Sequence, residues 1–190
     1  MFRKIIKFLM MLYNKPIRAL KHTKFHFTTH FGKNVLANGC VIGRYNYIAC
    51  NSVLNNVDMG CYCSIGPAVQ IGGMEHPYWE VSTSAWLGKC ESKRTKIGND
   101  VWIGAGSIVK QGIVIGDGAV IGANSFVNKD VPAYAIFFGS PAKLWKFRFS
   151  ESKVKKIEEN IKQLYVCTPP HILREKILQL EIEEDNVIHE

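Results

Sequence analysis

A repeat of six residues constrains the fold of this chain more than any other feature of its sequence. From Ile97 the chain divides into the blocks IGNDVW, IGAGSI, VKQGIV, IGDGAV, IGANSF and VNKDVP. The first residue of each block is β-branched and aliphatic, the second is glycine in four blocks, and the fifth is small or medium-sized. A noisier form of the repeat covers residues 36–76, with one step of five residues. A period of six fits neither an α-helix nor an ordinary strand.

Such a repeat predicts a chain that makes a short extended run, turns a corner and repeats. Aliphatic residues that recur at the same point stack into one continuous interior, and each coil must pack on its neighbours because it cannot bury its own apolar edge. The glycines in the second position are expected to allow unusual backbone angles at the corners. Cys40 and Cys63 fall at the small fifth position, which indicates a structural role for them.

The composition fits a single globular domain with an appendage. The chain has 190 residues, 47% of them hydrophobic, and a formal net charge of +8, which is compatible with a phosphate-bearing partner. In the central region, basic and aromatic residues do not interleave in a stripe, so we expect no nucleic-acid partner. The six cysteines form no CxxC pair, and we interpret them as reduced, apolar side chains of a cytoplasmic protein without a metal site.

Residues 1–30 are expected to form a helical or extended segment that precedes the repeat. The apolar run in MFRKIIKFLMMLY is short and is interrupted by Lys7, so it predicts neither a membrane span nor a secretory signal. A short cationic amphipathic helix here leaves two interpretations open. It could associate weakly with the inner face of an anionic membrane, or it could pack on the protein itself or on a partner subunit.

The repeat breaks between residues 73 and 96, in the polar and aromatic stretch GMEHPYWEVSTSAWLGKCESKRTK. A break this long inside a compact repeat is typical of a functional loop, and its aromatic residues argue against disorder. We therefore expect a loop that protrudes from the edge of the repeat structure. His76 lies in this loop, whereas the other five histidines lie outside the repeat body, so His76 is the candidate catalytic residue.

The chain changes character again over residues 149–190. Ser150 is a candidate N-cap for a helix whose apolar residues follow at helical spacing. A second helix with an acidic tail is expected after Pro170. We expect this region to form a helical cap over the open end of the repeat, because repeat proteins need their terminal apolar faces covered.

Three segments carry a resemblance to a known family. They are YCSIGPAVQIGGMEHP, KIGNDVWIGAGSIVKQGIVIGDGAVIGANSFVNKDVP and AIFFGSPAKLWKFRFSE. Together they resemble the hexapeptide-repeat acyltransferases, in the branch of the xenobiotic acetyltransferases and the polysaccharide (antigen) O-acetyltransferases. The resemblance implies an all-β domain over residues 31–148, namely a left-handed parallel β-helix with three hexads in each coil and the loop 73–96 protruding, followed by C-terminal α-helices.

The resemblance also implies a function. The chain is similar to O-acetyltransferases that move an acetyl group from the co-substrate acetyl-CoA to a hydroxyl of a sugar or surface polysaccharide intermediate, such as an O-antigen precursor. His76 would act as the general base. The alternative acceptor is an antibiotic, either streptogramin or chloramphenicol. The family further implies a homotrimer with active sites between subunits, which fits the lack of a deep pocket on a single prism.

Individual roles follow from the same resemblance. The expected contacts to the cofactor are Trp102, Ala105, Ala123, Lys129 and Lys143. The expected contacts to the acceptor, near His76 if the coils stack in register, are Tyr45, Asn46 and Tyr47. Plainer interpretations stay open, because the tryptophan could pack on the next subunit and the lysines could be solvated. Asn128 and Lys146 stand where the family often has threonine and arginine, which weakens the contacts assumed there.

Three rival functions or mechanisms make different predictions. A covalent route through Cys61 or Cys63 would give ping-pong kinetics, whereas direct transfer passes through a ternary complex. A zinc carbonic anhydrase on the same fold needs three histidine ligands, and the repeat body offers only His76. A non-catalytic β-helix that serves as a structural or binding module would have no affinity for CoA.

Overall fold

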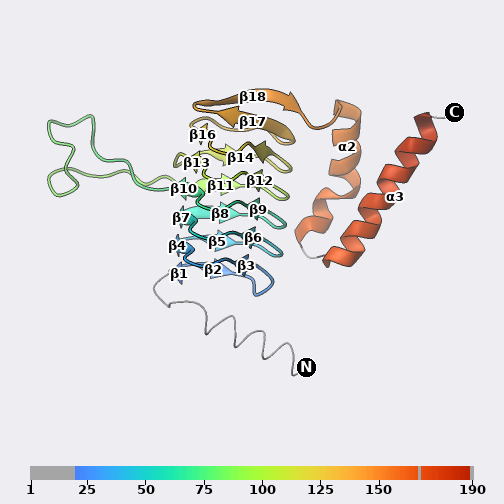
Figure 1. Ribbon diagram of the computed structural model, residues 1–190, viewed down its shortest axis with the longest axis horizontal. Helices are drawn as coiled ribbons and strands as arrows, with labels where there is room; N and C mark the ends of the chain where they lie inside the picture. Colours follow the sequence, from blue (N-terminus) through green and yellow to red (C-terminus); the bar gives the residue numbers. More distant parts are fainter. Residues whose placement is uncertain (1–19, 167, 189–190) are drawn as a thin grey trace, which may run out of the picture.

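The computed structural model describes residues 20–166 and 168–188, with side chains up to residue 181. Short strands form three parallel sheets along a three-sided stack of coils (Figure 1). The predicted amphipathic helix at the N-terminus lies outside the described residues. Within the described part of the chain, no helix is long and apolar enough to cross a membrane.

Each of the three sheets is formed by the strands on one side of the stacked coils. Sheet A contains β1 (Leu20–Lys21), β4 (Leu36–Asn38), β7 (Val53–Asn55), β10 (Gln70–Gly72), β13 (Ile108–Val109) and β16 (Phe126–Val127). Sheet B contains β2 (Lys24–Phe25), β5 (Val41–Ile42), β8 (Val57–Met59), β11 (Thr95–Ile97) and β14 (Val114–Ile115). Sheet C contains β3 (His30–Phe31), β6 (Tyr47–Ile48), β9 (Ser64–Ile65), β12 (Trp102–Ile103), β15 (Val120–Ile121), β17 (Ala135–Gly139) and β18 (Ala142–Phe147).

From β1 to β16, consecutive strands along the chain belong to sheets A, B and C in turn, so three strands complete one coil. Ile71 pairs with Leu54 of the preceding coil and with Val109 of the following coil. The predicted parallel β-helix is therefore confirmed. Its first described strand starts at Leu20, so the expected boundary at residue 31 was wrong. The inward side chains of that first coil are Leu20, Phe25 and Phe31. They pack against the core, but they are not β-branched and so do not follow the pattern of the repeat.

The interior of the β-helix is built from the first and fifth positions of the hexads. The first-position residues Ile97, Ile103, Val109, Ile115 and Ile121 are all at most 4% exposed. The fifth-position residues Val101, Ser107, Ala119, Ser125 and Val131 are buried beside them. Each large aliphatic side chain removed from water in this way contributes about 1.5–3 kcal/mol to folding. The repeat thus sets both the path of the chain and the composition of its core.

The second-position glycines have a different role from the one expected. None of Gly98, Gly104 and Gly116 has a positive φ. A Cβ atom added to Gly104 would instead stand 2.5 Å from the backbone nitrogen of Ala123 in the next coil. The positive φ angles occur at the fourth position, for example 69° at Gly106. Close approach of neighbouring coils explains the second-position glycines, and the left-handed backbone that turns each corner lies two residues later.

The C-terminal helices lie beside the β-helix rather than over its end (Figure 1). They are α2 (Glu151–Asn160), the 3-10 helix η1 (Lys162–Val166) and α3 (Pro170–Ile188). Ser150 is the N-cap of α2, because its side chain accepts a hydrogen bond from the backbone nitrogen of Lys153. Tyr165 and Leu173 pack with Tyr134 of the last corner in a small second core. The end of sheet C is covered by β18, which runs antiparallel to β17, so the expected helical cap over that end is not found.

The expected protruding loop leaves the stack between β10 and β11, and we call residues 73–94 the arm. It extends on the side opposite to the C-terminal helices (Figure 1). The coils below and above the arm stay in register, because β11 pairs with β8 of the preceding coil and β14 of the following one. The arm is therefore an insertion at a single corner, between sheets A and B.

Candidate active site

The arm begins with a narrow neck in which its two limbs pair. Glu75 donates its backbone N–H to the carbonyl oxygen of Glu91 at 2.9 Å, and Glu91 returns the same bond at 3.0 Å. This pairing is an isolated antiparallel bridge. It fixes the backbone directly before His76, so the candidate catalytic residue projects from an ordered part of the arm.

His76 is exposed, and its ring is oriented by the arm itself. The imidazole Nδ1 lies 2.8 Å from the carbonyl oxygen of Thr83. A carbonyl oxygen can only accept a hydrogen bond, so the neutral ring carries its proton on Nδ1 and keeps a lone pair on Nε2. Pro77, the next residue, is buried, so the segment between His76 and Thr83 begins with a packed side chain. The arrangement presents one basic nitrogen on a fixed ring.

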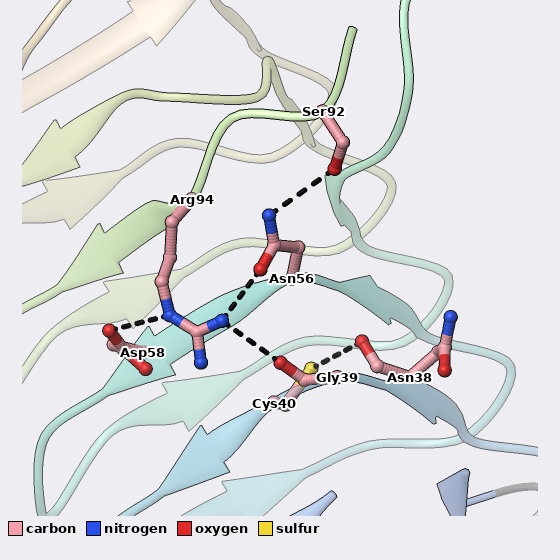
Figure 2. A network of polar contacts seen from close by, with 7 residues as sticks. All are labelled: Asn38, Gly39, Cys40, Asn56, Asp58, Ser92 and Arg94. Carbon is pink, nitrogen blue, oxygen red and sulfur yellow. Dashed lines mark hydrogen bonds and ion pairs between the residues drawn. The ribbon is translucent and has the colours of Figure 1, made fainter. Parts of the chain in front are cut away.

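The return limb of the arm is held to the β-helix by Arg94 (Figure 2). Its Nε donates to Asp58 at 2.8 Å, while its Nη1 donates to the side-chain oxygen of Asn56 at 2.6 Å and to the carbonyl oxygen of Gly39 at 3.2 Å. The amide of Asn56 also donates to Ser92 of the arm at 3.2 Å. One guanidinium thus ties the arm to the two preceding coils.

A cavity of about 380 Å³ lies at the root of the arm on sheet A. It is lined by Gly72, Gly73, Met74, Glu75, Ile108, Val109, Lys110, Gln111, Phe126 and Asn128. The Nζ atom of Lys110 lies 2.9 Å from the carboxylate of Glu75. The hydrogen bond that Lys110 donates to Glu75, together with the negative charge of Glu75, raises the pKa of Lys110. The cavity therefore combines an apolar wall with an ion pair next to His76.

Three of the expected cofactor contacts lie along the edge between sheets C and A. Ala105 and Ala123 are exposed in successive coils, joined by a hydrogen bond from Asn124 to the carbonyl oxygen of Ala105. Lys143 pairs with Phe138, which lies directly above Gly122 in the stack. Lys129 follows β16 and so lies at the other edge of sheet A. The structure brings the two alanines and Lys143 together and leaves Lys129 apart from them.

Trp102 and Tyr47 share the outer face of sheet C. Both pair with Ser64, one from the coil after it and one from the coil before it, and both side chains are about half exposed. Within one chain this face lies away from the arm (Figure 1). The expected proximity of the acceptor residues to His76 is therefore wrong for a single chain.

Tyr45 and Asn46 occupy the corner between sheets B and C. The ring of Tyr45 stacks on Tyr62, with centroids 5.0 Å apart. Asn46 is buried, and its amide donates to the carbonyl oxygen of Gly60 at 2.9 Å and accepts from the backbone of Cys63 at 2.7 Å. Its polar atoms serve the corner of the coil, so we do not carry Asn46 into the proposed site.

The cysteines considered as rival nucleophiles lie inside the protein. Cys63 is 1% exposed, and burial raises the pKa of its thiol to about 12. Its sulfur lies 3.1 Å from the carbonyl oxygen of Gly98. Cys61 is buried as well. A thiol that stays protonated and has no access to solvent is a poor nucleophile. Cys167 lies outside the described residues.

Sequence reasoning missed the residues that hold the arm in place. Thr83 acts through its backbone, which leaves no trace in residue type. Arg94 contacts residues up to 55 positions away, which no local pattern reveals. Lys110 did leave a signal, because it occupies the second position of a hexad, where most neighbouring blocks have glycine. Glu75 is recognisable only once its partner is known.

Comparison with known proteins places the chain among bacterial transferases. The family model described as bacterial transferase hexapeptide (six repeats) matches residues 94–129. A chloramphenicol acetyltransferase of Morganella morganii is 41% identical over 117 residues, which are 53% of this chain and 56% of the relative. A galactoside O-acetyltransferase of Lactococcus lactis is 34% identical over 127 residues, or 66% of this chain and 56% of the relative. The chain thus spans about half the length of these two relatives.

A solved structure shows the same fold. A hexapeptide-repeat acetyltransferase of Vibrio cholerae, crystallised with acetyl coenzyme A, superposes with a TM-score of 0.60 at 24% identity and covers 76% of this chain and 86% of the other. A longer match in sequence is the chloramphenicol acetyltransferase of Agrobacterium fabrum. It is 33% identical over 154 residues, which are 64% of this chain and 74% of the relative. With this match, the family model and the confirmed β-helix, the chain belongs to the hexapeptide-repeat family of bacterial transferases.

Proposed function

We propose that this chain is an acetyl-CoA-dependent O-acetyltransferase in which His76 is the general base. The observation that carries the proposal is the 2.8 Å contact between Nδ1 of His76 and the carbonyl oxygen of Thr83. It leaves Nε2 as the basic nitrogen of an exposed ring on an ordered arm. A base held within reach of a hydroxyl proton is what acetyl transfer to an alcohol needs.

The proposed reaction is a direct transfer. Acetyl-CoA supplies the acetyl group as a thioester. Nε2 of His76 removes the proton of the acceptor hydroxyl while the hydroxyl oxygen forms a bond to the acetyl carbonyl carbon. The carbon–sulfur bond then breaks, and the imidazolium returns the proton to the departing sulfur. Backbone N–H groups at the rim of a coil are suitable donors for the negative charge that develops on the carbonyl oxygen.

CoA is proposed to lie along the edge between sheets C and A. Ala105 and Ala123 expose nothing larger than a methyl group there, so a long thin pantetheine chain can approach the backbone closely. Lys143 at the same edge is the proposed contact for the phosphates, because ammonium groups bind phosphate as point charges, whereas Lys129 lies at the far edge of sheet A and is not carried into this site. Trp102 is the proposed aromatic contact nearest the reacting group.

The proposed enzyme is a homotrimer with its active sites between subunits. His76 and the face that carries Trp102 and Tyr47 lie on different sides of one chain, so a complete site needs His76 from one subunit and that face from another. The arm supports this assembly, because its Trp86 is 94% exposed and its Leu87 is 76% exposed. Large apolar side chains left uncovered in this way are typical of a protein interface.

The proposed acceptor is a hydroxyl of a sugar or of a surface polysaccharide intermediate. The relative from Lactococcus lactis named galactoside O-acetyltransferase supports this class. A second candidate is an antibiotic, which the relatives named chloramphenicol acetyltransferase support. Tyr45, which is partly buried, and Tyr47, which is exposed, are proposed acceptor contacts in either case, since aromatic rings at the surface pack against sugars and antibiotics alike.

The test is acetyl-CoA consumption by the purified protein with nucleotide sugars, free glycans, chloramphenicol and streptogramins as acceptors. We expect activity with a sugar and a drop of about 10²- to 10⁴-fold in kcat for His76→Ala, because that is the usual contribution of a positioned general base. Binding of CoA, followed by calorimetry, is expected to stay unchanged. The matched control is His171→Ala, on the exposed surface of α3.

Each outcome of this test has a distinct meaning. Activity with chloramphenicol alone would replace the proposed acceptor with the second candidate. A His76→Ala variant with a near-normal rate would rule out the proposed base. A protein that neither binds nor consumes acetyl-CoA would favour the non-catalytic β-helix instead.

A further inference from the structure

We propose that Lys110 is a positioning residue that fixes His76 through Glu75. The inference rests on the proposed role of His76 as the general base. Lys110 and Glu75 lie 35 positions apart in the sequence, yet the Nζ atom of one is 2.9 Å from a carboxylate oxygen of the other. Glu75 is the residue directly before His76.

The path from the β-helix to the catalytic ring is short and made of fixed contacts. The backbone N–H of Lys110 donates to the carbonyl oxygen of Val127 at 2.9 Å, within the parallel ladder of the coils. Its side chain then reaches the carboxylate of Glu75, whose backbone is bonded in both directions to Glu91. His76 follows with its ring held by Thr83. The ion pair is thus the side-chain link from the rigid stack to the limb that carries His76.

The two limbs of the arm are held by different residues. On the return limb, Gln111 accepts a hydrogen bond from the backbone of Lys93 at 2.7 Å, and Arg94 contacts the two preceding coils. On the outbound limb, Lys110 of the following coil forms an ion pair with Glu75. Loss of that pair leaves the return limb attached to the coils and the outbound limb held by its backbone bridge to Glu91, without the side-chain contact to the following coil.

A second ion pair at the neck serves as a control for the proposed role of Lys110. Both glutamates of the neck bridge have a lysine partner, and Glu91 pairs with Lys93 at 3.3 Å. Lys93 belongs to the arm, so that ion pair does not connect the arm to a coil. Both ion pairs are partly exposed, and such pairs contribute about 0–1 kcal/mol to stability. Removal of either lysine charge is therefore expected to leave the fold intact, and only Lys110 is expected to matter for catalysis.

Substrate binding is the competing explanation for Lys110, because its side chain also lines the cavity at the root of the arm. The two roles separate in the kinetics. A lysine that binds substrate raises KM when it is removed, whereas a lysine that positions the base lowers kcat and leaves KM alone. Misplacement of a catalytic group by about 1 Å can cost up to about 10²-fold in rate.

The experiment compares Lys110→Met, Lys110→Arg and Lys93→Met with the wild-type protein. We expect Lys110→Met to lower kcat about tenfold with KM for acetyl-CoA and acceptor within twofold, since part of the alignment is lost. Lys110→Arg restores the charge and is expected to recover most of the rate. Lys93→Met is expected to match the wild type. Hydrogen exchange at the amides of Glu75 and Glu91 is expected to quicken in Lys110→Met alone.

The exchange measurement does not depend on activity, so the two proposals can fail separately. If the wild-type protein transfers no acetyl group but the neck amides exchange faster in Lys110→Met, the proposed function fails and the link between Lys110 and the neck stands. If exchange and kcat both stay at wild-type values in Lys110→Met, the positioning role is wrong. A raised KM with unchanged kcat also overturns it and makes Lys110 a substrate contact.

Discussion

At the scale of single residues, position in the repeat decides what a polar side chain can do. The sequence predicts Asn46 as an acceptor contact, but Asn46 stands at the inward fifth position, and its amide is hydrogen-bonded to Gly60 and Cys63. A buried amide must find such partners, so the repeat itself argued against a surface role. His76 could be predicted because it interrupts the repeat. Its partner Thr83 could not, because the contact uses a carbonyl group that every residue has.

The fifth position also predicts the reactivity of Cys63. Burial raises the pKa of its thiol to about 12, so at pH 8 the thiol is protonated and inaccessible. We expect an alkylating reagent to label Cys50, which is exposed, and to spare Cys63 until the protein is unfolded. Peptide mapping by mass spectrometry distinguishes the two sites. Labelling of native Cys63 at the rate of Cys50 would contradict the buried position.

The same thiol gives a pH dependence with a definite sign. Because the folded-state pKa is raised above its ordinary value of 9.0 to about 12, the unfolded chain loses this proton first as the pH rises. The contribution of Cys63 to stability is therefore complete below pH 9 and is lost between about pH 9 and 12. Urea unfolding across this range is expected to show a smaller decline in Cys63→Ala than in the wild type.

At the scale of elements, the corners contain two classes of glycine, one required for close packing of the coils and one for its backbone angle. Gly104 is needed for space, because its Cβ would meet the backbone of the next coil at 2.5 Å. Gly39 is needed for its backbone angle, with φ at 65° and no atom within 4 Å of an added Cβ. Asn56 occupies the matching corner one coil later with φ at 54°. Asparagine tolerates this left-handed region better than most residues.

Asparagine substitution therefore separates the two classes. Gly39→Asn is expected to change the free energy of unfolding by less than about 0.5 kcal/mol, since it copies a residue that the fold already accepts there. Gly104→Asn is expected to cost at least about 2 kcal/mol, because a side chain has to be forced between close-packed coils. Urea unfolding measures both. Equal losses of unfolding free energy in the two variants would contradict the distinction between the two classes of glycine.

The elements of the β-helix could be predicted far better than the elements around it. Hexads from Ile97 onward gave the strands, their order and their inward residues, since each is fixed by local spacing. The first coil was missed because Phe25 and Phe31 take the place of β-branched residues. The helices were found but placed wrongly, because their position depends on distant contacts such as that of Tyr165 with Asp100. Local sequence patterns do not indicate contacts between residues so far apart in the sequence.

At the scale of the whole molecule, the described chain carries its proposed catalytic parts on different sides. The arm holds His76 on one side, and sheet C holds Trp102 and Tyr47 away from it (Figure 1). The arm also exposes the large apolar side chains of Trp86 and Leu87. A closed ring of identical subunits brings the arm of one chain to a face of the next without any further partner.

This assembly predicts a mass and a way to break it. Light scattering of the wild-type protein is expected to give three times the chain mass of 21.4 kDa. Trp86→Glu puts a charge in place of an exposed apolar side chain of the arm, so the oligomer is expected to dissociate and kcat to fall, while circular dichroism stays unchanged. Lys89→Glu is a control for charge at a nearby site of the arm. An active monomer would contradict the shared site.

The single-corner insertion of the arm bears on how such a protein can diversify. β10 and β11 keep their pairing with the coils on either side, so the peptide between them can lengthen, shorten or change composition while the rest of the rod stays as it is. Descendants of one ancestor can thus change the arm by rewriting some twenty codons while they inherit the coils on either side intact.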